Sequence, residues 1–141
     1  MIREEFLYVI WERRLFVQEG LRTTCGKNLE IIDPGKRNIH EGPDFTCARI
    51  RAGRLIWVEN VEIHVCSSDW KNHGHHMNPV YDNVILHVVL QYRGEVWNAL
   101  GNHVFSCIIP FHEQLYNRYK ELVETRECLP CENHISQIPD L

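Results

Sequence analysis

Two short runs carry the residues best suited to metal chemistry. Glu41-Gly42-Pro43-Asp44-Phe45 places a carboxylate at the start of an expected strand, and Val61-Glu62-Ile63-His64-Val65 places a second one eighteen residues after Asp44. Asp44 and Glu62 can each give an oxygen to Mg²⁺ or Mn²⁺. His64 could hold or deprotonate a water that attacks a phosphate, or stabilise developing charge once protonated. We therefore predict Asp44 and Glu62 as metal ligands, and all three as catalytic residues.

The same residues also fit a purely structural interpretation. One acid followed at a distance by Glu-x-His is a weak pattern, because many strands carry such residues. In this interpretation Glu62 and His64 lie on a solvated sheet face, and Asp44 caps a turn after Pro43. Residue types alone do not distinguish the catalytic interpretation of these residues from the structural one.

A second group of candidate ligands lies in the histidine-rich run 69–76. It contains His73, His75 and His76, and imidazoles beside a carboxylate suit Zn²⁺ or another transition metal. His73 and His76 would share a face if a helix continued through the intervening glycine. The alternatives are phosphate contact beside a metal site and an exposed, His-rich turn. His87, inside an apolar run, fits a hydrogen-bonded core histidine better than a ligand.

Basic and aromatic residues near these motifs point to a phosphate-bearing partner, for which we expect DNA. A basic rim is formed by Lys36, Arg37, Arg49, Arg51 and Arg54. The residues expected to contact nucleic acid are Arg49, Arg51, Lys71 and His73, with Trp70 stacking on a base. A solvated hairpin edge would carry the same charges, so this alternative stays open.

Composition is that of one globular domain. A chain of 141 residues can bury a hydrophobic core without the help of disulfides or structural metals. No apolar run reaches membrane-spanning length. Charges near the N-terminus argue against a secretory signal, and the cysteines sit mostly in apolar runs, so we expect reduced thiols in a cytoplasmic protein. The net charge of −4 argues against a protein that coats nucleic acid. It leaves the oligomeric state open.

Elements follow from periodicity and turn residues. A helix is expected over 2–18, and strands over 29–32, 44–52, 54–66 and 84–90, with a short helix from 69 to about 76. Shorter strands are expected near 95–98 and 103–109, before a helix from about 111 to 126. Because side chains alternate along a strand, Val61, Ile63 and Val65 should face the core, and Glu62 and His64 the opposite side. The fold class is mixed α/β, a central sheet with helices packed against it.

The domain is expected to span residues 1–126, with 127–141 as a C-terminal tail. The tail carries Cys128 and Cys131 with two residues between them. A zinc site needs about four ligands, and the nearby His134 makes only three. The pair is therefore expected to be structural, or half of a site completed elsewhere.

Residues 2–90 resemble the PD-(D/E)XK superfamily, which has the restriction-endonuclease-like fold. The resemblance rests on Pro43-Asp44 and Glu62-Ile63-His64, with His64 in place of the signature lysine, and on the order of the elements. It implies an αβββαβ core, with a mixed central sheet flanked by helices. It also implies Asp44 and Glu62 as metal ligands, with Glu12 as a loose match to an acid that some members carry on the first helix. Glu41, next to the motif, is a further acidic candidate.

Five runs resemble a family of bacterial proteins catalogued only as a domain of unknown function. They are Pro34–Asn38, Glu41–Thr46, Val61–His64, Ser67–Trp70 and Asn83–Val89. Members of that family are longer, so the resemblance implies that 1–141 is an N-terminal domain. It also implies that Cys128 and Cys131 have partners beyond Leu141.

These observations give one leading hypothesis and two alternatives. The first is a divalent-metal-dependent nuclease that hydrolyses DNA with Mg²⁺ or Mn²⁺. The second is a catalytically degraded nuclease-like fold that binds nucleic acid or protein, favoured by the missing lysine. The third is a zinc-dependent hydrolase that uses the histidines of residues 73–76.

Overall fold

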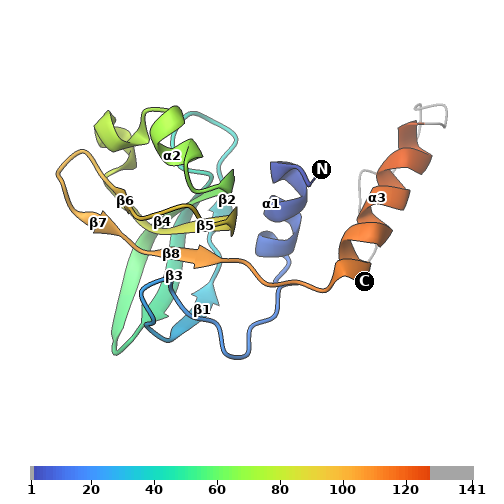
Figure 1. Cartoon of the computed structure of the whole chain (residues 1–141), viewed down its shortest axis with the longest axis horizontal. Coiled ribbons are helices and arrows are strands. Elements are labelled where there is room, and N and C mark those ends of the chain that lie inside the picture. Colours follow the sequence, from blue (N-terminus) through green and yellow to red (C-terminus); the bar gives the residue numbers. More distant parts are fainter. Residues whose placement is uncertain (1, 128–141) are drawn as a thin grey trace.

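The computed structural model describes residues 2–127, and its elements surround one curved sheet (Figure 1). The helices are α1 (Glu4–Glu12), α2 (Asp69–Asn72) and α3 (Glu113–Glu127), with 3₁₀ turns η1 (His75–Met77) and η2 (Pro79–Tyr81). The strands are β1 (Leu29–Asp33), β2 (Lys36–Arg37), β3 (Phe45–Ala52), β4 (Leu55–Cys66), β5 (Val84–Gln91), β6 (Val96–Trp97), β7 (His103–Val104) and β8 (Ser106–Ile108).

The central sheet is mixed, which confirms the predicted α/β class. Its strand order is β1-β3-β4-β5-β8, with β2 paired to β3. The β1–β3 and β3–β4 pairs are antiparallel, whereas β4–β5 and β5–β8 are parallel. The predicted hairpin around Gly53 is therefore confirmed. The segment from Cys66 to Val84, which contains α2, η1 and η2, connects two adjacent parallel strands, as a crossover must.

The first helix is shorter than the predicted 2–18. It ends at Glu12, and Arg14 adopts a left-handed backbone with φ of 55°. The Arg14 guanidinium donates hydrogen bonds to the carbonyls of Ile31 and Ile32 in β1. These long-range contacts turn the chain away from the helix, although the apolar periodicity continues through Phe16.

Side chains near the C-terminal end of β4 alternate between the two faces of the sheet, as predicted. Val61 and Ile63 are fully buried in the main core, together with Phe6 and Ile10 of α1. Glu62 and His64 point to the opposite face. That face is also closed to solvent, because Glu62 is 4% exposed and His64 is 2% exposed. The solvated-face interpretation is therefore wrong.

The cover over Glu62 and His64 is the crossover segment, with α2 lying above the sheet in Figure 1. Trp70 of α2 is 1% exposed and packs with Val84, Val96 and Val104 in a second apolar cluster. Its indole N–H donates to the carbonyl of Trp97. Trp70 thus fills the space between α2 and the sheet, and the prediction that it stacks on bases is wrong.

Three further predictions concern the rest of the chain. Among the described cysteines, those at positions 25, 47, 66 and 107 are free thiols, as predicted. None of the helices in residues 2–127 is long and apolar enough to cross a membrane. The tail, with Cys128 and Cys131, lies outside the described residues.

Candidate metal centre

Backbone hydrogen bonds bring the two predicted acids together across β3 and β4. Phe45 pairs with Val61, which sets Asp44 beside Glu62. The backbone N–H of Asp44 donates to Oε1 of Glu62 at 3.0 Å, and the N–H of Ile63 donates to Oδ2 of Asp44 at 2.9 Å. The strand register therefore fixes both carboxyl groups at one point of the sheet.

The acids interact strongly because water is largely excluded. Burial is the main cause that raises the pKa of Asp44 and of Glu62, each to about 7. The negative charge of Glu62 is part of the increase for Asp44, whereas the hydrogen bond from Asp44 N–H acts in the opposite direction and lowers the pKa of Glu62. A buried glutamate beside a half-buried aspartate, both with a raised pKa, forms a site where a divalent cation can replace a bound proton.

The acidic residue contributed by α1 is Glu4, which the sequence analysis did not single out. Tyr8 donates its hydroxyl hydrogen to Glu4 Oε1 at 2.9 Å and approaches Asp44 Oδ1 at 3.2 Å. Burial raises the pKa of Glu4, and the charge of Asp44 contributes to the increase. The predicted candidate, Glu12, lies exposed at the other end of α1, about 12 Å away along the helix axis. In the sequence, the sign that Glu4 belongs with Tyr8 is their i, i+4 spacing, which puts both side chains on one face of a helix.

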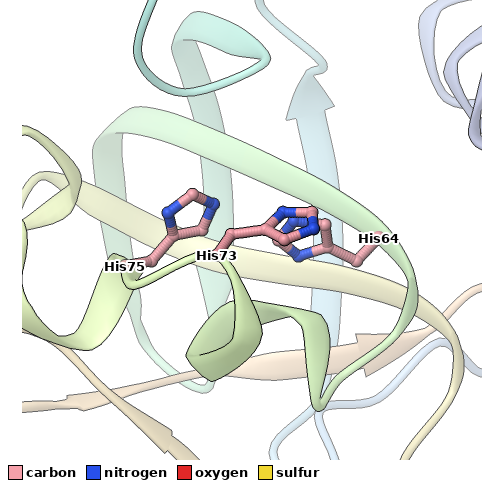
Figure 2. Close-up of side chains that lie close together, drawn as sticks. All are labelled: His64, His73 and His75. Carbon is pink, nitrogen blue, oxygen red and sulfur yellow. The ribbon is translucent and has the colours of Figure 1, made fainter.

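Three histidines meet on the side of Glu62 that faces away from Asp44. One ring nitrogen from each of His64, His73 and His75 lies within 4.8 Å of the others, and we call these residues the histidine cluster. Their side chains lie together in Figure 2. Oε2 of Glu62 is 2.9 Å from His75 Nε2 and 3.4 Å from His64 Nε2.

His75, not His76, accompanies His73 in this cluster. Gly74 has a left-handed φ of 74°, so α2 stops at Asn72 and η1 restarts the chain at His75. The i, i+3 rule that paired His73 with His76 therefore does not apply. His73 remains exposed, whereas His75 is buried against Tyr81, with ring centroids 3.6 Å apart.

His64 is held neutral. Its pKa is lowered to about 3, mainly by burial and in part by the neighbouring His75 and His73. Its Nδ1 lies 2.7 Å from Nε2 of His87, which is fully buried on β5. His87 is thus the hydrogen-bonded core histidine that was predicted. A neutral His64 cannot replace the charge of a lysine near pH 7, but it offers an unprotonated nitrogen to a metal.

The remaining predicted residues surround the centre at greater distances. Arg49 and Arg51 are exposed on β3, opposite Val58 and Ile56, about 13 and 20 Å along β4 from Glu62. Arg51 also forms an ion pair with Glu30 at 3.3 Å. The structure therefore does not bring Arg49 or Arg51 to the acids. Lys71 and Glu41 are exposed, on α2 and on the loop before β3.

Arg37 of β2, which belongs to the basic rim, lies nearer to the acids than Arg49 and Arg51 do. Its guanidinium carbon lies 3.9 Å from the centre of the Tyr8 ring, in cation–π geometry. The hydroxyl of that ring contacts Asp44. An exposed guanidinium is therefore held one side chain away from the acid pair.

Comparison with known proteins identifies a family but not an activity. A model of the family described as "Protein of unknown function (DUF2851)" matches residues 4–141. The chain belongs to this family. A search of curated proteins found no match, and neither did a search of solved structures. Family membership thus agrees with the second resemblance seen in the sequence, but it assigns no activity to the centre.

Proposed function

We propose that this protein is a divalent-metal-dependent nuclease of the restriction-endonuclease-like class. The observation that carries the proposal is the hydrogen-bonded contact between Asp44, directly before β3, and the buried Glu62 of the antiparallel neighbour β4. The element order supports it, because α1, β1, β3, β4, α2 and β5 follow the αβββαβ succession once the two-residue strand β2 is set aside, and β5 is parallel to β4. The chain's acids and imidazoles suit a divalent ion, with Glu62 at the meeting point of both groups.

Each residue has a defined part in this proposal. Glu62 and Asp44 supply the anionic ligands, and the hydrogen bond from Ile63 N–H orients Asp44. A bound divalent ion would neutralise a phosphate and lower the pKa of a water. Arg37 provides the positive charge that His64 lacks, since the tyrosine beneath it positions the guanidinium for a phosphate oxygen. Lys71 and Arg49 are placed further out for contacts to a nucleic-acid backbone.

The test is cleavage of end-labelled single- and double-stranded DNA by metal-stripped protein supplied with Mg²⁺, Mn²⁺ or Zn²⁺ in turn. We expect cleavage with at least one ion, reduced at least about 100-fold by Glu62→Gln. Glu41→Gln is the matched control, because it removes an exposed acid of the same loop and strand region. Cleavage that persists in Glu62→Gln overturns the proposal. Salt-sensitive DNA binding without turnover in any ion also overturns it, in favour of a binding module.

A further inference from the structure

The histidine cluster specifies the class of ion more narrowly than the acid pair does. We propose that the ion is a transition metal of the Zn²⁺ type, bound by Glu62 and by one nitrogen from each histidine of the cluster. This inference rests on the proposed function and refines its ligand set, because Glu62 faces the cluster with Oε2, so that Glu62 and not Asp44 is the carboxylate ligand of this ion. Metal binding without substrate can still be measured on its own.

Geometry is the first argument. In a tetrahedral zinc site with ligand distances near 2.0–2.1 Å, neighbouring ligand atoms lie about 3.3 Å apart. Oε2 of Glu62 is already 2.9 Å from His75 Nε2 and 3.4 Å from His64 Nε2. The cluster nitrogens lie within 4.8 Å of one another. Contraction by up to about 1.5 Å would bring the nitrogens to this spacing, and His73 has the freedom for it because its side chain is exposed.

The ligand chemistry is the second argument. Mg²⁺ prefers a shell of oxygens and keeps several waters, whereas imidazole nitrogens select Zn²⁺ and its neighbours in the first transition row. Three imidazoles with one carboxylate oxygen are therefore a poor magnesium site. Four protein donors fill the tetrahedral shell of Zn²⁺, and a water or phosphate oxygen would enter as a fifth ligand, since Zn²⁺ in enzymes can expand to five-coordination.

The surroundings of the ligands provide the third argument. Metal-binding histidines usually donate their second ring N–H to an outer partner that fixes the ring. His64 has such a partner in His87, 2.7 Å from its Nδ1 and fully buried. His75 is 5% exposed, and its Nδ1 has no hydrogen-bond partner among the described residues. Its ring is held by the stacked Tyr81 instead. Two of the three rings are thus held in place before any ion arrives.

The experiment measures zinc directly. Tag-free full-length protein is stripped with a chelator and titrated with Zn²⁺ by calorimetry, with Mg²⁺ at millimolar concentration as a competitor. We expect one equivalent of Zn²⁺ to bind and Mg²⁺ not to displace it. His73→Ala should weaken binding about 100-fold or more, which exceeds the usual effect of losing an outer partner. His76→Ala is the matched control, because it removes a histidine of the same segment that lies outside the cluster.

Several results would overturn the inference. They are the absence of zinc binding, displacement by Mg²⁺, unchanged affinity in His73→Ala, and an equal loss in His76→Ala. His73 is exposed, so its variant should keep the wild-type circular dichroism. Zn²⁺ binding without DNA cleavage would refute the nuclease alone. Cleavage that depends on Glu62 and uses Mg²⁺, without a zinc site, would refute this inference alone.

Discussion

Replacing Asp44 by asparagine should stabilise the metal-free protein at pH 8. The folded state holds the pKa of Asp44 at about 7, compared with 3.8 for an unperturbed aspartate, because burial and Glu62 disfavour its charge. Because the folded pKa is raised, the favourable contribution of protonated Asp44 is complete below pH 4. It is lost as the pH rises through 7. Asparagine never ionises and can still accept the hydrogen bond from Ile63 N–H.

The expected size follows from the shift in pKa. About three pKa units correspond to at most about 4 kcal/mol at 1.36 kcal/mol per unit. Asp44 is only half-buried, and part of its shift comes from the charge of Glu62, so we expect about half of that, roughly 2 kcal/mol. For a domain of this size the melting temperature should rise by about 6 °C. Functional centres commonly cost stability in this way.

The assay is thermal and urea unfolding of wild type and Asp44→Asn in a chelator, at pH 4 and at pH 8. Glu41→Gln, which removes an exposed carboxylate, should leave the free energy of unfolding unchanged at both values. The reasoning is refuted if Asp44→Asn is no more stable than wild type at pH 8. It is also refuted if the gain is the same at pH 4, since Asp44 is then neutral in the wild type.

Two further predictions concern the support of the centre. Gly35→Ala should lower the free energy of unfolding in urea by about 2–4 kcal/mol. The φ of Gly35 is 89°, and a Cβ there would lie 2.6 Å from the carbonyl oxygen of Thr46. A decrease of less than about 1 kcal/mol would show that the β2–β3 hairpin can shift to make room. His87→Leu should lower the zinc affinity measured by calorimetry about 10-fold or more, because His64 loses the hydrogen-bond partner of its Nδ1. The circular dichroism spectrum should stay unchanged. Wild-type zinc affinity in this variant would mean that His87 does not orient His64.

Local patterns were sufficient where neighbours along the chain determine the structure. Gly53 between two alternating runs predicted the β3–β4 hairpin, and the period of two placed Glu62 and His64 on one face. The burial of that face was missed. It depends on Trp70 and the crossover segment folding back over β4, and nothing in β4 itself encodes that contact.

The predictions that failed near the metal centre have identifiable structural causes. The end of α1 is set by hydrogen bonds from Arg14 to β1, which are invisible to helical periodicity. The choice of Glu4 over Glu12 depends on the direction in which α1 crosses β4. Gly74 was visible as a helix breaker, but only its left-handed φ shows that His75 joins the cluster.

The sequence by itself determined which chemistry is available: two acids eighteen residues apart, a histidine two residues after the second, and a histidine-rich run next along the chain. Side-chain alternation then set the face of the sheet. The tertiary structure alone decided that the two acids meet at one point of the sheet with raised pKa values, and that His64 and His75 meet one carboxylate oxygen with His73 beside them. Both results depend on distances between residues far apart in the chain. Those distances are set by strand register and by the cover of the crossover segment.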